Sequence, residues 1–111
     1  VEQNFEEAAR LYKLAAEQNH SSALNDLASC YMAGQGVEKN IDEGIKLYTL
    51  SANLGCPMGQ YNLGNVFYYG VGVKQDIEEA IRLYKLSSSQ NYALALNDLA
   101  NLYIKGQEVE K

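Results

Sequence analysis

The segments EEAARLYKL at residues 6–14 and EEAIRLYKL at residues 78–86 differ at one position, and ALNDLA occurs both at residues 23–28 and at residues 95–100. Both pairs of segments are 72 residues apart, and a looser copy lies midway between them, so the sequence repeats every 36 residues. A period of this length is typical of stacked helical repeats, in which a single repeat cannot bury its own apolar face. The period therefore decides the fold class before any single helix is assigned.

Three blocks of 36 residues account for nearly all of the 111 residues: repeat one at 4–39, repeat two at 40–75 and repeat three at 76–111. No insertion separates the blocks, and 22 of the 36 positions are identical between the first and the third. Residues 1–3 match the end of repeat one, so we interpret them as the tail of a preceding repeat. The chain then starts and stops at the same phase, as expected for a segment of a longer array.

Each block is expected to begin with an amphipathic helix. An Asn or Asp precedes a Glu by three residues, which is the spacing of a capping box: Asn4 and Glu7, Asn40 and Glu43, Asp76 and Glu79. Opposite charges four residues apart are expected to pair on the solvated face: Glu6 with Arg10, Asp42 with Lys46, Glu78 with Arg82. The apolar stripe in repeat one consists of Phe5, Ala8, Leu11, Tyr12 and Ala15. These helices should end near Asn19, Gly55 and Asn91, which tolerate a left-handed backbone.

A second helix is expected in each block, starting around residues 20–23, 56–59 and 92–95 and ending at Gly34, Gly70 and Gly106. Pro57, the only proline, suits a first turn, where the missing N–H would have no helical partner. The apolar residues of these helices form one stripe per block: Ala23, Leu27, Cys30 and Tyr31; Gly59, Leu63, Val66 and Phe67; Ala95, Leu99, Leu102 and Tyr103. No stretch alternates with the two-residue period of a strand.

Composition restricts the class of protein. With 47% hydrophobic and 21% charged residues the chain is expected to pack a globular core, and no apolar run approaches the roughly 18 residues of a membrane span. A net charge of -5 argues against nucleic acid or anionic lipid as a partner. Cys30 and Cys56 should lie about 15 Å apart along neighbouring helices, too far for a disulfide, which favours a cytoplasmic location.

These patterns resemble Sel1-like repeats, which are relatives of the tetratricopeptide repeat. The matching segments are A-x3-L-A-x2-Y at 23–31, G-x3-L-G-x2-F at 59–67 and A-x3-L-A-x2-Y at 95–103, followed by GQGV, GVGV and GQEV. Departures from the family pattern are Leu11, Leu47 and Leu83 in place of Trp, Asn19 and Asn91 in place of Gly, Ser87 and Ser88 in place of Ala, and Glu108 in place of the second loop glycine. The resemblance implies an all-α fold, an α-solenoid of three helix-turn-helix repeats forming a right-handed superhelix with a concave face.

The resemblance also implies an adaptor that binds a peptide or protein segment on the concave face of the second helices. Opposite their buried stripe these helices carry mostly uncharged polar and aromatic residues, and we predict as the binding residues Asn25, Ser29, Tyr61, Asn65, Tyr68, Tyr69, Asn97, Asn101 and Lys105. Asn amides both donate and accept, so they suit the backbone of an extended peptide, while tyrosines supply contact area. The alternative is that the same residues pack helix against helix or against flanking repeats.

No catalytic or metal site is expected, so the chain is predicted to be neither an enzyme nor a cofactor-binding protein. His20 is the sole histidine, and its neighbours Ser21, Ser22 and Asp26 are too close in sequence to complete a triad. The glycine pairs after the second helices end a helix instead of following a strand, so they do not form a phosphate-binding loop.

Two functional interpretations follow. The first is a protein-binding scaffold, and the alternative is a structural or regulatory array that braces or activates an attached enzyme domain, for example a kinase, in a longer chain. The outer helices are also expected to lack neighbours, which favours end-to-end self-association, with Phe5, Ala9, Leu102 and Ile104 on the uncovered flanks.

Overall fold

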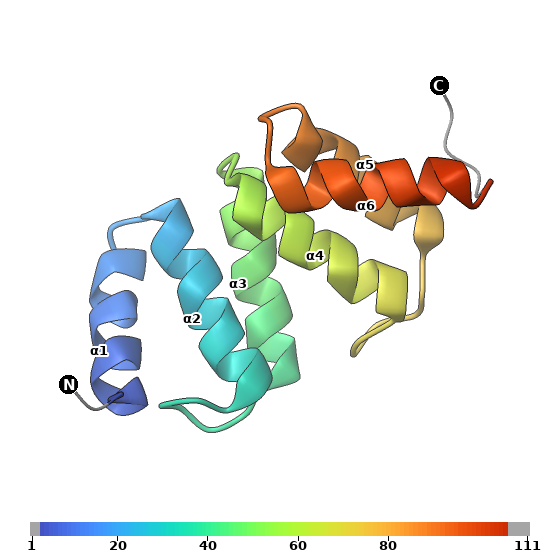
Figure 1. Ribbon diagram of the computed structural model, residues 1–111. Helices are drawn as coiled ribbons and strands as arrows, with labels where there is room; N and C mark the ends of the chain where they lie inside the picture. The colour runs from blue at the N-terminus through green and yellow to red at the C-terminus, as the bar shows by residue number, and fades with distance from the viewer. Residues whose placement is uncertain (1–2, 107–111) are drawn as a thin grey trace.

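The computed structural model describes residues 3–106, and in this range the chain forms six α-helices and no strand (Figure 1). They are α1 (Phe5–Ala16), α2 (Ser21–Ala33), α3 (Ile41–Asn53), α4 (Pro57–Tyr69), α5 (Ile77–Ser88) and α6 (Ala93–Ile104). Successive helices stack along a molecule of 43 × 27 × 26 Å, with α1 and α6 at opposite ends (Figure 1). The predicted all-α solenoid, two helices to each block, is confirmed.

Side-chain caps start the first helix of every block, as predicted. The Oδ1 atoms of Asn4, Asn40 and Asp76 each accept a hydrogen bond from the backbone N–H three residues later, at 3.0–3.1 Å. These bonds satisfy N–H groups that have no carbonyl partner in the first turn. Local sequence alone therefore sets where α1, α3 and α5 begin.

The predicted ion pairs four residues apart are wrong. In α1, Nε and Nη2 of Arg10 donate to the two oxygens of Glu7, three residues away, at 2.9 and 2.6 Å. Arg82 binds Glu79 in the same bidentate way in α5, at 2.8 and 2.6 Å. At this spacing both guanidinium nitrogens reach one carboxylate, which gives two charge-assisted hydrogen bonds. Among the described residues, none of the predicted pairs forms: Glu6–Arg10, Asp42–Lys46 and Glu78–Arg82.

The turns within the blocks contain the predicted left-handed residues. Asn19, Gly55 and Asn91 have φ of 58°, 87° and 62°. The helices end two or three residues before them, because short backbone bonds such as Asn19 N–H to Ala16 O (2.9 Å) already tighten the chain. Gly34 and Gly70 cap α2 and α4 in the left-handed conformation, and Gly106 follows α6 with a φ of 70°. Glu108 and residues 1–2 of the predicted N-terminal tail lie outside the described residues.

The most extensive helix packing crosses the block boundaries. α2 packs against α3, and α4 against α5, more extensively than the two helices within a block pack against each other. One buried cluster runs through both boundaries and contains Leu24, Leu27, Ala28, Leu47, Tyr48, Ala52, Leu63, Val66 and Leu83. A second cluster joins α5 to α6 and contains Ala80, Ile81, Tyr84, Leu99 and Leu102. Each repeat therefore depends on its neighbour for much of its core.

Two serines bond across these boundaries. The Oγ of Ser51 donates to the carbonyl oxygen of Ser21, and the Oγ of Ser87 donates to that of Pro57, each at 2.8 Å. Both serines are fully buried. The hydroxyl supplies the donor of each bond, and a carbonyl oxygen of the preceding repeat is the acceptor, so Ser87 has a structural role at a position where the family that the sequence resembles has Ala.

At the ends of the array the predicted burial is only partly correct. Leu11 was expected in a buried stripe, yet it is 51% exposed because no helix precedes α1 among the described residues. Tyr103 is 42% exposed for the corresponding reason at α6. Of the four residues expected on uncovered flanks, Phe5 and Ile104 are exposed. The prediction is wrong for the other two, because Ala9 and Leu102 pack inside their own helix pairs.

Candidate protein-interaction site

Part of the predicted binding face is used inside the molecule. Asn25 is 4% exposed, and its Oδ1 accepts a hydrogen bond from Nδ2 of Asn62 on the next second helix at 2.8 Å. The same arrangement recurs one repeat later, where the hydroxyl of Tyr61 donates to Oδ2 of Asp98 at 2.7 Å. The four residues therefore tie α2 to α4 and α4 to α6.

A second pair of bonds links each second helix to the first helix of the next block. Ser29 Oγ and the hydroxyl oxygen of Tyr48 are 2.8 Å apart, and the hydroxyl of Tyr84 donates to Oδ1 of Asn65 at 2.5 Å. Ser29 and Asn65 occupy the same position in successive repeats, as do Tyr48 and Tyr84. In repeats one and two the polar face thus contributes to internal packing, which was the alternative interpretation.

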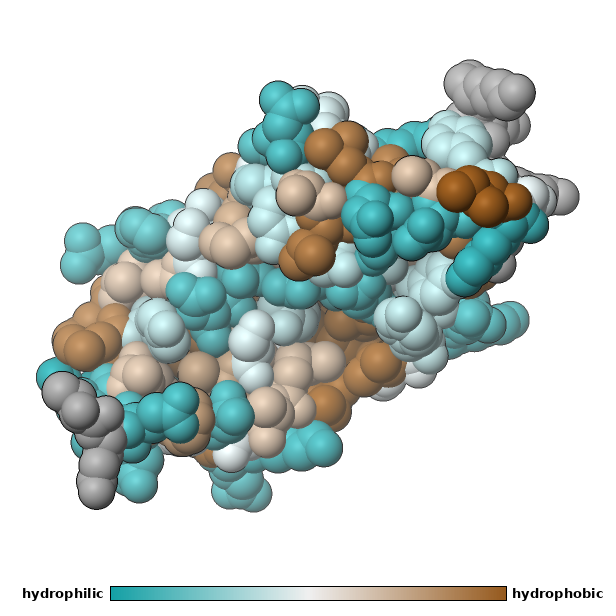
Figure 2. Space-filling model, viewed as in Figure 1, coloured by the Kyte–Doolittle hydropathy of each residue, from teal (hydrophilic) through white to brown (hydrophobic). Residues whose placement is uncertain are grey.

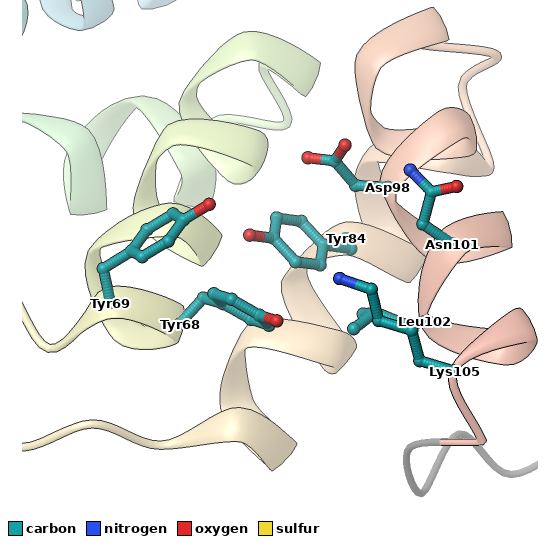
Figure 3. Close-up of a pocket in the computed structure, with 7 residues that line it drawn as sticks. All are labelled: Tyr68, Tyr69, Tyr84, Asp98, Asn101, Leu102 and Lys105. Carbon is teal, nitrogen blue, oxygen red and sulfur yellow. The ribbon is translucent and has the colours of Figure 1, made fainter.

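Four of the five remaining predicted residues line a hollow between α4 and α6. Its volume is about 200 Å³, and we call it the α4–α6 hollow; its lining residues are Tyr68, Tyr69, Tyr84, Asp98, Asn101, Leu102 and Lys105. Figure 3 shows Tyr68 and Tyr69 on one side, Asp98, Asn101 and Lys105 on the other, and Tyr84 between them. The side chain of Lys105 points back toward Tyr84 (Figure 3). Phenol, amide, carboxylate and ammonium groups therefore face one small space.

Tyrosine rings form the wall of the hollow on the α4 side. The rings of Tyr68 and Tyr69 meet edge to face with centroids 4.9 Å apart, and Tyr68 lies 6.3 Å from Tyr84. Tyr61 packs behind them, 5.6 Å from both Tyr84 and Tyr92. Such tilted and edge-to-face pairs are favourable beyond the area they bury. Mutual packing therefore contributes to the positions of these rings.

Burial and negative charge keep the inner phenols protonated. Burial raises the pKa of Tyr84, and the carboxylate of Asp98 raises it further. Burial also raises the pKa of Tyr61, and so does its hydrogen bond to Asp98. Because a phenolate near a carboxylate is disfavoured, both groups stay neutral donors well above neutral pH.

The predicted binding residues therefore separate into three groups. Asn25, Ser29, Tyr61 and Asn65 form the inter-helix bonds, and Tyr68, Tyr69, Asn101 and Lys105 line the α4–α6 hollow. Asn97 is exposed on α6 outside the lining of the hollow. The binding residues predicted from the sequence did not include Tyr84, Asp98 or Leu102, which also line the hollow. The recurrence of Tyr at positions 12, 48 and 84, and of Asp at 26 and 98, was the available signal.

The histidine and the two cysteines, whose side chains are the usual candidates for other chemistry, lie at structural positions. His20 caps α2, its Nδ1 accepting the Ala23 N–H at 3.2 Å. Cys30 and Cys56 are buried free thiols, and burial raises the pKa of Cys30. Within residues 3–106 there is no group of three or more potential metal ligands. Over the same range, every helix is too short or too polar to cross a membrane.

The chain matches the Sel1 repeat over residues 1–20, 21–56, 57–92 and 93–111. A Sel1 repeat protein from Oxalobacter formigenes is 32% identical with a TM-score of 0.90, and the match covers 100% of this chain and 45% of that one. The protein c5321, a protective antigen present in uropathogenic Escherichia coli strains that displays an SLR fold, is 31% identical with a TM-score of 0.88. That match covers 99% of this chain and 24% of c5321. No curated protein matches.

The chain thus spans less than half the length of either solved relative. The matched units of 36 residues begin with a second helix, so α2 is grouped with α3 and α4 with α5. These are the pairs with the most extensive packing. The repeat defined by similarity and the repeat defined by packing therefore coincide.

Proposed function

The chain belongs to the Sel1 repeat family, and on that premise we propose that it is a scaffold that binds a peptide or protein segment at the α4–α6 hollow. Repeat arrays of this kind generally serve as protein-interaction scaffolds, because stacked helix pairs present an extended surface and not an enclosed active site. The proposal concerns which part of that surface makes the contact.

The observation that carries the proposal is the exposure of Tyr69. This side chain is 70% exposed at the end of α4, and it faces the hollow that Asn101 and Lys105 line from α6. Tyrosine gives large contact area with little loss of side-chain freedom and is enriched among residues that dominate binding energy. Asn101, on the opposite side of the hollow, is exposed, and its amide is able to bond a peptide backbone.

The size and charge of the hollow support a segment of protein as the ligand. A volume of about 200 Å³ lies below the roughly 300–1,000 Å³ of pockets that enclose small molecules, and it suits an inserted side chain. The hollow holds one carboxylate and one ammonium group, whereas the whole chain carries a net charge of -5. A neutral or basic segment is therefore favoured over an acidic one.

The test is capture of a partner by the chain and by a double variant, Tyr69→Ala with Lys105→Ala. Both side chains are exposed, so the variant should keep its fold, which circular dichroism checks. We expect the affinity for the captured partner to fall at least about tenfold, because one tyrosine at an interface centre is worth this much. Leu50→Ala, which removes an exposed side chain from α3, is the matched control. Equal affinity of the folded double variant and the parent chain would refute the assignment of the hollow.

A further inference from the structure

The two ends of the array each present an apolar helix face that is covered elsewhere in the same molecule. On α6 the face consists of Leu96, Ala100, Tyr103 and Ile104, all of them exposed. The equivalent residues of α2 are Leu24, Ala28, Tyr31 and Met32, which are buried or half-buried because α3 covers them. Figure 2 shows brown, apolar side chains at the surface over α6.

The second of these apolar faces is on α1, at the other end of the array. It consists of Ala8, Leu11, Tyr12 and Ala15, which are equivalent to Ala80, Leu83, Tyr84 and Ser87 of α5. All four residues of α5 are buried against α4 and its neighbours, and Leu83 is only 2% exposed whereas Leu11 is 51% exposed. Three of the four residue types are identical between α1 and α5, and three of four between α6 and α2.

We propose that two copies of this chain join head to tail, with α1 of one copy docking on α6 of the other. The joint would repeat the packing of α3 on α2 and of α5 on α4, which is the most extensive helix packing in the molecule. The occupant is a second copy because both halves of the joint are already present on one chain, in residue types that the internal joints show to be complementary. This surface is separate from the α4–α6 hollow and does not depend on its function.

Polar groups at the two ends also match. Inside the array, Tyr84 donates to Asn65, and Asn62 donates to Asn25. The equivalent residues across the new joint are Tyr12 with Asn101 and Asp26 with Asn97. Each of these pairs combines a donor with an acceptor, so the joint leaves neither polar pair unmatched. Both amides are exposed in the single chain.

A joint of this kind uses two different surfaces, so it does not close on itself. Every added copy presents another free α6 face, and the assembly grows with concentration instead of stopping at a dimer. Sedimentation equilibrium of the parent chain should then show an average mass that rises above 12.3 kDa as concentration increases.

The first test is Leu11→Glu against the matched control Leu14→Glu. Both leucines are on α1 and similarly exposed, at 51% and 47%. However, Leu50 and Leu86, the equivalents of Leu14, stay 44% and 41% exposed inside the array, so Leu14 lies off the joint. We expect Leu11→Glu to weaken association at least about 30-fold, as for a central interface residue, and Leu14→Glu to leave it within about threefold of the parent chain.

The second test uses Leu96→Glu on α6, with Ala100→Glu as a replacement if circular dichroism shows lost helix. Each variant alone should be monomeric, because one end is blocked. An equal mixture of Leu11→Glu and Leu96→Glu chains has one intact α6 face and one intact α1 face, so it should form a dimer of twice 12.3 kDa that grows no further. Only a head-to-tail joint predicts this complementation.

Three results would overturn the proposal. The first is a parent chain that stays monomeric up to millimolar concentration, in which case these faces belong to another occupant such as a further repeat of the same polypeptide. The second is equal weakening by Leu11→Glu and Leu14→Glu. The third is a variant mixture that remains monomeric.

Discussion

Gly36 allows the loop after α2 to pack closely against the start of α1. Its φ is 76°, and a Cβ there would collide with the carbonyl group of Phe5 at the start of α1. Gly55 has a similar φ of 87°, but a Cβ added to it would meet no atom within 4 Å. A comparison of substitutions at the two glycines therefore separates the cost of a strained backbone from the cost of a clash between the loop and α1.

We predict that Gly36→Ala lowers the free energy of unfolding by about 2–5 kcal/mol, whereas Gly55→Ala lowers it by about 1–2 kcal/mol. Both substitutions strain a left-handed backbone, and only the first adds a clash with backbone atoms that cannot rotate away. Urea unfolding followed by circular dichroism measures both values. Equal losses would show that the loop of repeat one does not need its contact with α1.

The inner phenols predict a loss of stability at high pH. Burial raises the folded-state pKa of Tyr84, and the nearby Asp98 adds to this rise, so the folded protein keeps a proton that the unfolded chain releases near its ordinary pKa of about 10. The unfolded state then binds fewer protons, and the free energy of unfolding falls as pH rises above about 10. Below that pH the contribution of Tyr84 is fully present.

We therefore expect the free energy of unfolding of Tyr84→Phe to decline less than that of the parent chain between pH 10 and about 12. At neutral pH the variant should be less stable, because it loses the bond to Asn65. Leu50→Ala, which changes an exposed side chain without a titratable group, is the control and should show the same decline as the parent chain. Urea unfolding at each pH measures the slopes. The same slope in Tyr84→Phe and the parent chain would contradict this explanation.

At the scale of the helix, sequence reasoning predicts what is local and misses what depends on the opposite helix. Caps such as Asn40 and left-handed residues such as Asn91 act on their own backbone, so their spacing is enough to predict them. Whether an Asn on a second helix is buried depends instead on which helix packs against it. Asn25 is buried against Asn62, whereas Asn101, chosen by the same pattern, lines a hollow, because no helix follows α6 among the described residues.

The spacing of α3 and α4 depends on Gly59. A Cβ at this position would lie 2.7 Å from the Cβ of Ser51 and closer still to its Oγ. We predict that Gly59→Ala lowers the free energy of unfolding by about 1–3 kcal/mol, despite the better helix propensity of alanine. In a Ser51→Ala background, which lacks the nearest atom, Gly59→Ala should cost less, as chemical denaturation of the two single variants and the double variant would measure. A Gly59→Ala chain more stable than the parent would show that propensity outweighs the contact.

At the scale of the whole molecule, stability should be highest in the middle. α3 and α4 each have a packed helix on both sides, whereas α1 and α6 each have one uncovered flank. In a repeat array, stability is approximately a sum over repeats and their neighbour interfaces, so a helix with one interface opens at lower free energy.

Native-state hydrogen exchange should therefore protect the amides of α3 and α4 most and those of α1 and α6 least. At micromolar concentration we expect the end helices to exchange at least about tenfold faster than the central ones, since the missing interface is the most extensive kind in the array. If copies join head to tail, protection of α1 and α6 should rise with protein concentration, while that of α3 and α4 rises less. The Leu11→Glu chain removes the joint without touching the core, so its end helices should exchange at a rate independent of concentration. Uniform protection across all six helices would instead mean that the array opens as one cooperative unit.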